Sequence, residues 1–225
     1  MNPMTWHRLI LAFFAGAALT LGAAGCDKLQ SRTTQEHVQR AKDFQAKGDM
    51  RASIIELKSA LQKTPGNAEA RLLLGQLYLA VDEGYAAEKE LEAAAKLGVG
   101  EEVLKAAVAQ ALLLQGRYAE VLDKIQPGPQ TSRTNRARIL TLRGDALLGL
   151  RRIADGCLSY QEALGVDEES AATRLGIAKC AIARRQYETA QGELTQSLKL
   201  DPKNPEAIIL KGDLAQILSD PKGAA

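Results

Sequence analysis

Small residues recur through the chain at an almost constant interval. Six positions hold Ala or Gly, with successive separations of 34, 34, 35, 34 and 34 residues: Ala41, Gly75, Ala109, Gly144, Ala178 and Gly212. Apolar residues follow three places after the first five, at Phe44, Tyr78, Leu112, Leu147 and Ala181. A period of this length marks a unit that cannot bury its apolar side alone, so neighbouring units must stack. The period therefore predicts an elongated array of repeats.

A second set of positions repeats in step further along each unit. Large residues stand at Leu57, Leu91, Ile125, Tyr160 and Leu194, and small ones follow in four of the units at Ala60, Ala94, Ala163 and Ser197. Gly48 and Gly116 lie between the two apolar stretches of their units, where a turn between helices needs a permissive backbone. Pro65 and Pro202 follow the second stretch, where a helix has to stop. Each unit is therefore predicted to be a helical hairpin.

A hairpin repeated every 34 residues resembles the tetratricopeptide repeat. The resemblance predicts an all-α fold, an α-solenoid of tetratricopeptide helical hairpins with about five and a half repeats. The predicted array spans residues 34–219. Its units cover residues 34–67, 68–101, 102–136, 137–170, 171–204 and, as a partial unit, 205–219.

Two parts of the array depart from the repeat. Pro127 and Pro129 cannot continue a helix, so the second helix of the third unit is expected to end early and leave a kink or hinge. The sixth unit supplies a single helix, which is either a cap or the first half of a further repeat. If the helix is a cap, residues 220–225 are a tail. If it is half a repeat, they are the truncated start of the next helix. The second reading is favoured by the apolar residues of that helix: Ile208, Leu210, Leu214 and Ile217.

The first residues have the pattern of a secretory signal. An apolar run from Leu9 to Leu21 follows Arg8, and the small residues 22–25 lead to Cys26. This pattern predicts a signal peptide over residues 1–25, because the run is too short for a membrane span. An uncleaved membrane anchor is the alternative.

Cys26 directly after Ala-Ala-Gly resembles the bacterial lipoprotein box. The resemblance implies that the sulfur of Cys26 is acylated and that residues 26–33 are a short tether. The protein would then lie in the bacterial cell envelope, lipid-anchored and facing the periplasm, with Asp27 favouring the inner membrane. A soluble periplasmic protein cleaved nearby is the alternative.

Two further cysteines, Cys157 and Cys180, lie inside predicted helices. They could pair in an oxidising compartment, and their spacing matches no metal or redox motif. We favour two small buried thiols.

The residues offer little to catalysis. Charged residues make up 25% of the chain and the formal net charge is +2, which does not favour a nucleic-acid partner. His37 is the only histidine of the predicted array, and a lone helical histidine without a partner motif favours a structural role. The sequence also lacks the HExxH, phosphate-loop and GxSxG motifs. We therefore expect no enzyme activity, no metal site and no cofactor.

In arrays of this kind the first helix of each unit lines a concave face. The period places a polar residue on that face one position after each small site, and an apolar residue three positions later. The predicted partner-binding groove consists of Gln76, Leu79, Gln110, Leu113, Asp145, Leu148, Lys179 and Ile182. Such an apolar stripe with polar edges suits an extended peptide or a partner helix. In the alternative interpretation the leucines belong to the core between helices. The Lys and Asn of tetratricopeptide carboxylate clamps are absent, because Leu72, Ala106 and Thr141 stand in their place.

The lipoprotein signal, the stretch ARLLLGQLYLA (residues 70–80) and the stretch NPEAIILKGDLA (residues 204–215) together resemble one family. It is the tetratricopeptide-repeat lipoprotein of the PEP-CTERM/exosortase system, found beside exopolysaccharide genes. The resemblance implies a role in sorting or exporting surface proteins and polysaccharide, without catalytic residues. Members of that family are considerably longer.

The predicted function is thus a non-enzymatic protein-interaction scaffold of the bacterial envelope. Its expected partners are an envelope or secreted protein in the groove and the membrane at the N-terminal lipid. Two alternatives remain: an envelope-assembly lipoprotein for outer-membrane proteins or type IV pili, and a structural spacer.

Overall fold

The computed structural model describes residues 32–219, which form eleven α-helices and no strand. The helices are α1 (Thr34–Ala46), α2 (Met50–Lys63), α3 (Ala68–Ala80), α4 (Gly84–Lys96), α5 (Glu101–Leu114), α6 (Tyr118–Lys124), α7 (Arg133–Gly149), α8 (Ile153–Val166), α9 (Ala171–Ala183), α10 (Tyr187–Leu200) and α11 (Pro205–Ser219). The predicted signal peptide, the lipidation site Cys26 and the tail 220–225 lie outside the described residues, as does most of the tether. Within residues 32–219, the structure contains no helix with the length and apolar character that a membrane crossing requires.

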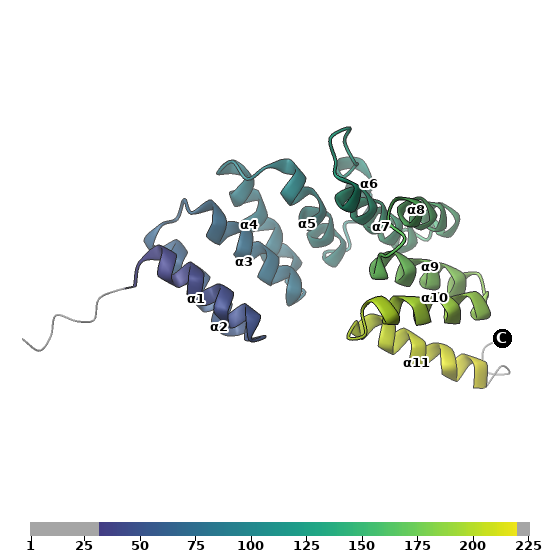
Figure 1. The fold of residues 1–225 in the computed structure, drawn as a ribbon. Coiled ribbons are helices and arrows are strands. Elements are labelled where there is room, and N and C mark those ends of the chain that lie inside the picture. Colours follow the sequence, from purple (N-terminus) through teal and green to yellow (C-terminus); the bar gives the residue numbers. More distant parts are fainter. Residues whose placement is uncertain (1–31, 220–225) are drawn as a thin grey trace, which may run out of the picture.

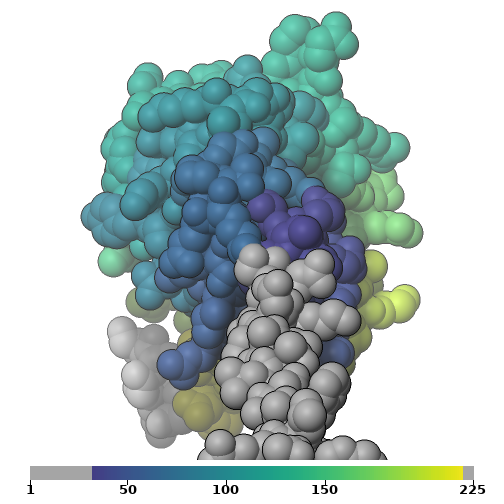
Figure 2. All heavy atoms as spheres, turned by 90° about the vertical axis from the view of Figure 1, so that its left-hand side faces the viewer, coloured from purple at the N-terminus to yellow at the C-terminus, as the bar shows by residue number. Residues whose placement is uncertain are grey.

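Consecutive helices pair into five hairpins, from α1–α2 to α9–α10, and α11 packs on the last of them. The hairpins stack in chain order into an arch, with α1 at one end and α11 at the other (Figure 1). Seen from the end that carries α1, the later hairpins lie behind the earlier ones (Figure 2). The predicted α-solenoid of tetratricopeptide-type hairpins is confirmed.

Side-chain caps set where the first helix of most hairpins begins. Thr33 accepts from the backbone N–H of Glu36 at 3.2 Å, and the Glu36 carboxylate accepts from the Thr33 N–H at 2.6 Å. Asn67 caps α3 in the same way through the N–H of Ala70. Such caps satisfy backbone donors that have no partner within the helix.

The turn inside every hairpin contains one residue with a positive φ. These residues recur at the repeat interval: Gly48 (78°), Asp82 (57°), Gly116 (70°), Arg151 (61°) and Arg185 (59°). The sequence showed this requirement only at the two glycines. The three other hairpins adopt the same left-handed turn with a side chain present, at some conformational cost.

The core follows the predicted pattern of small and large residues. The first five small sites are buried, and a Cβ placed on Gly75 would lie only 2.8 Å from Leu91. Leu57, Leu91, Tyr160 and Leu194 of the second helices have no exposed surface. The small sites therefore let the two helices of a hairpin approach closely, as expected.

The third hairpin is irregular, as the prolines predicted. Its second helix, α6, has only 7 residues and ends at Lys124, and α7 begins at Arg133. That start is four residues before residue 137, where the period placed the fourth unit. The guanidinium of Arg143 donates to the carbonyls of Leu122 and Ile125, both at 2.9 Å, and so provides partners for carbonyls at the end of α6.

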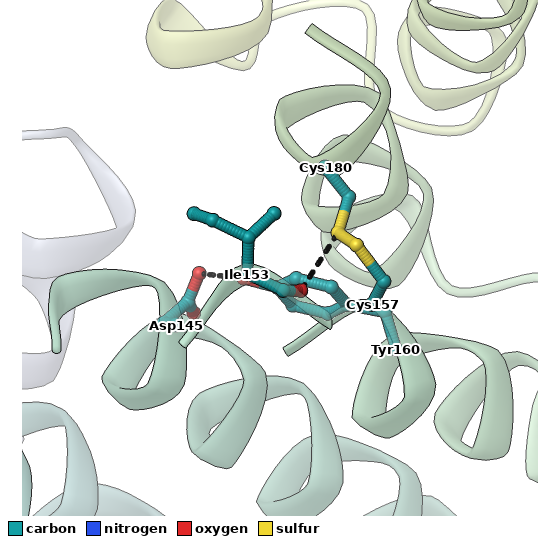
Figure 3. The surroundings of a disulfide bond; sticks show 5 residues. All are labelled: Asp145, Ile153, Cys157, Tyr160 and Cys180. Atoms are coloured by element: carbon teal, nitrogen blue, oxygen red, sulfur yellow. Dashed lines mark hydrogen bonds between the residues drawn. A yellow bond between two sulfur atoms is a disulfide. The ribbon is translucent and has the colours of Figure 1, made fainter. Parts of the chain in front are cut away.

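Cys157 of α8 and Cys180 of α9 form a disulfide, with their Cα atoms 5.7 Å apart (Figure 3). Our expectation of two separate thiols was wrong, although both residues are buried as expected. The spacing of the two cysteines gave no sign of the bond, because it depends on how the fourth hairpin stacks on the fifth. The disulfide thus joins two neighbouring repeats.

Candidate functional site

A groove of about 970 Å³ runs along the concave face of the array. Its floor comes from the first helices of successive units, α5, α7 and α9, and from the start of α11. The turns at the two ends of these helices supply its edges, including Asp82 and Tyr118 on one side and Asp167 and Asp201 on the other. The expectation that first helices line a concave groove is met in this part of the array.

Five of the eight predicted groove residues line this space: Gln110, Leu113, Asp145, Leu148 and Lys179. Gln76 is exposed on α3, outside the groove. Leu79 is buried in the core, and Ile182 packs against the core around α9 and α10. These two residues therefore belong to the core between helices, which was the alternative interpretation of the apolar positions.

Several groove residues were missed from the sequence. Leu114 lies at the end of α5 and keeps 39% of its surface exposed, and Arg138 and Ala172 lie exposed near the starts of α7 and α9. For Arg138 and Ala172, the missing information was the offset between neighbouring first helices, which the stacked structure supplies. Residues 27 or 28 positions after a predicted polar groove residue lie beside it on the next first helix.

Polar contacts in this register form a ladder between neighbouring first helices. Each step of the ladder joins one first helix to the next, from α1 to α11, which gives five steps. Three of them are paired: Lys42 with Glu69 at 2.6 Å, Gln110 with Arg138 at 3.2 Å, and Lys179 with Glu206 at 2.6 Å. The offsets are 27, 28 and 27 residues, and the longer one spans the unit of 35 residues. The ladder gives the concave face a row of charges beside the apolar side chains.

Asp145 has a different environment from the other ladder residues. Its Oδ1 accepts from the Tyr160 hydroxyl at 2.8 Å and lies 3.7 Å from the ammonium of Lys179 (Figure 3 shows the tyrosine contact). Burial raises the pKa of Asp145, against the opposing effects of Lys179 and the Tyr160 hydroxyl, and nearby Glu206 raises it further. The pKa of Tyr160 is raised by its own burial and by the adjacent carboxylate. The charge on Asp145 is thus only partly compensated by the protein.

The groove as a whole is acidic. Its walls carry five carboxylates, Asp82, Asp145, Asp167, Asp201 and Glu206, and two cations, Arg138 and Lys179. The complete chain has a formal net charge of +2. The acidic character is therefore local to the groove, where it affects the charge of a bound partner.

His37 has a structural environment, as predicted. Its Nδ1 lies 2.6 Å from Glu56 of α2, and Arg40 donates to the same carboxylate at 2.8 Å. The same register pairs Arg71 with Glu90 and Arg174 with Glu193 in two other hairpins. This position therefore links the two helices of a hairpin.

The arrangement of the groove provides contact surface and hydrogen-bonding groups along its length. In residues 32–219, no group of three or more His, Cys, Asp or Glu side chains is arranged to hold a metal ion. Within the groove, one step of the ladder is an ion pair, between Lys179 and Glu206. Such a surface suits recognition of an elongated segment.

The comparisons with known proteins agree with this fold. Residues 45–111 match the tetratricopeptide repeat family. No curated protein matches the sequence. Proteins of the tetratricopeptide type are generally non-catalytic scaffolds that bind peptides or proteins in a groove.

Three solved structures are similar over most of the chain. PilF of Pseudomonas aeruginosa aligns over 83% of this chain and 85% of its own, with a TM-score of 0.59 and 19% identity. A thermophilic tetratricopeptide protein of Thermus thermophilus covers 82% of this chain and 100% of its own, with a TM-score of 0.63 and 14% identity. PilW, described as a widely conserved type IV pilus biogenesis factor, aligns over 83% of this chain and 86% of its own, with a TM-score of 0.59 and 12% identity. At these identities the likeness shows the fold alone.

Proposed function

We propose that the chain is a non-enzymatic scaffold that holds an extended segment of another protein in its concave groove. The observation that carries this proposal is the groove itself, formed by successive first helices and lined by both apolar and charged side chains. Leu113, Leu142 and Leu148 give it apolar contact area. The ladder residues give it polar partners for a peptide backbone and its side chains.

The proposed location is the bacterial envelope, with the chain lipid-anchored and facing the periplasm. The apolar N-terminal segment followed by Cys26 supports this location. The disulfide between Cys157 and Cys180 adds independent support, because such bonds persist in oxidising compartments such as the periplasm.

The proposed pathway is exopolysaccharide-associated sorting or export of surface proteins. Its support is the resemblance of the lipoprotein signal and of residues 70–80 and 204–215 to the exosortase-associated lipoproteins. Type IV pilus assembly is the second candidate, supported by the fold shared with PilF and PilW. The two pathways supply different proteins to the groove, so the identity of the bound protein distinguishes them.

Photo-cross-linking in intact cells tests the proposal. A photoreactive amino acid is placed at position 114 or 172, both exposed within the groove, and captured proteins are identified by mass spectrometry. Position 158 on α8 is the matched control, because Leu158 is 63% exposed and does not line the groove.

We expect one dominant envelope or secreted protein from positions 114 and 172 and not from position 158. A pilus component would favour the second pathway, and an exported surface protein the first. Equal capture from all three positions, or none from a folded and membrane-bound chain, would contradict the groove proposal and favour a spacer.

A further inference from the structure

The ladder on the concave face is interrupted at two of its five steps. Gln76 is followed in register by Val103, and Asp145 is followed by Ala172. Neither Val103 nor Ala172 can form an ion pair or a side-chain hydrogen bond. Gln76 is neutral, so only the step from Asp145 to Ala172 leaves a charged residue without a partner on the next first helix.

The second interrupted step lies inside the groove, since both Asp145 and Ala172 line it. At the equivalent step between α9 and α11, Lys179 and Glu206 approach to 2.6 Å. Ala172 is exposed and its side chain is a single methyl group, so the place where a cation would stand is open to the groove.

The protein compensates Asp145 weakly from its other side. Lys179 is 3.7 Å from Oδ1 but only 2.6 Å from Glu206, so its main partner is the glutamate. Tyr160 donates one hydrogen bond to the same Oδ1, and no described residue donates one to Oδ2. Burial raises the pKa of Asp145, which agrees with an under-compensated charge. A cation supplied from outside would find a carboxylate with an available oxygen.

We propose that the groove selects a basic segment, whose Lys or Arg side chain enters above Ala172 and pairs with Asp145. This inference rests on the proposed function, because it names the chemistry of the segment that the groove binds. The excess of carboxylates in the groove walls favours the same sign of charge. The flanking residues of the segment are apolar, since Leu142, Leu148 and Leu175 line the floor on either side of Asp145.

Peptide binding to the full chain, followed by fluorescence anisotropy, tests the inference. The probe is a labelled nine-residue peptide of alternating leucine and serine with lysine at its centre. The comparison peptides carry norleucine or glutamate at that place. We expect the lysine peptide to bind about tenfold more tightly than the norleucine peptide, and the glutamate peptide to bind more weakly than both.

Two substitutions assign the preference to this step of the ladder. Ala172→Lys places a cation of the protein's own at the open position and should abolish the preference for lysine. Asp145→Asn removes the charge, keeps an acceptor for Tyr160, and should also abolish it. Val103→Lys is the matched control at the other interrupted step, outside the groove, and should leave the preference unchanged.

The outcomes separate this inference from the proposed function. Equal affinity for the lysine and norleucine peptides would overturn the inference while leaving a peptide-binding groove. Loss of the preference in Val103→Lys as well would overturn its assignment to Asp145. If no peptide binds, the inference fails, and the proposed function then depends on whether cross-linking from positions 114 and 172 captures a partner.

Discussion

Tyr160 occupies the position that leucine or isoleucine holds in the other hairpins. The larger ring fits because glycine faces it on both sides. A Cβ on Gly144 of α7 would lie 2.5 Å from the ring, and one on Gly176 of α9 would lie closer still. The tyrosine therefore spans the layer between two repeats, and its hydroxyl reaches Asp145 on the groove side.

Gly176→Ala should destabilise the protein by about 1–3 kcal/mol, because the new methyl group overlaps the buried Tyr160 ring. Urea denaturation measures the change in the free energy of unfolding. Gly192→Ala in α10 is the matched control. Its Cβ would meet no other atom within 4 Å, so removing a helical glycine should stabilise by about 0.5–1 kcal/mol. Equal effects of the two substitutions would contradict the packing described for Tyr160.

Asp145→Asn should stabilise the folded chain at pH 7. Because burial raises the pKa of Asp145 above its ordinary value of 3.8, the folded state binds the proton more tightly than the unfolded state. Stability therefore falls as the pH rises from that ordinary value through the folded pKa, and the ionised carboxylate is a net cost above it.

The advantage of the Asp145→Asn variant should shrink as the pH falls and should vanish near pH 3, where the aspartate is protonated in both states. Urea denaturation at pH 7 and at about pH 3 measures it. A variant that is less stable than the wild type at pH 7 would show that the pair with Lys179 outweighs burial. A role in binding would explain why the chain keeps a carboxylate at this position even though its charge lowers the stability of the folded protein.

At the scale of the helices, the sequence predicted each hairpin from residues that act locally. The small sites, the large residues of the second helices, and the prolines after α6 all determine packing or helix ends within one unit. The left-handed turns at Asp82, Arg151 and Arg185 were missed, because a required positive φ is visible in a sequence only where glycine meets it. The disulfide was missed because it joins two units, and its geometry depends on their stacking.

Removing that disulfide should weaken the stacking of the fourth hairpin on the fifth. The bond closes a loop with a sequence separation of 23, so its loss should lower the free energy of unfolding by about 3 kcal/mol. The double variant Cys157→Ala, Cys180→Ala should show faster amide hydrogen exchange in α9–α11, with α1–α4 unchanged. Dithiothreitol should have the same effect on the wild type and none on the variant. Exchange that is unchanged throughout would contradict this role of the bond.

At the scale of the molecule, the groove depends on the curvature of the whole stack. Sequence register identified Gln110, Asp145 and Lys179 at one repeat position and Leu113 and Leu148 at another, because equivalent positions on successive first helices face the same way. It could not show that the groove begins near α5, and so it included Gln76 and Leu79 wrongly among the residues that line it. It also could not place Arg138 and Glu206 beside their partners, since the offset between units becomes apparent only once the helices are stacked.

Complementation of a strain that lacks the protein distinguishes a binding groove from a spacer. Leu114→Asp places a charge in the groove, and Leu158→Asp places the same charge at an exposed position outside it. Both variants should accumulate and fold like the wild type, as checked by immunoblot and circular dichroism. We expect Leu158→Asp to restore the function that the strain has lost, and Leu114→Asp not to restore it. Full restoration by Leu114→Asp would contradict a binding groove, because a spacer depends on the length of the array and not on the chemistry of its concave face.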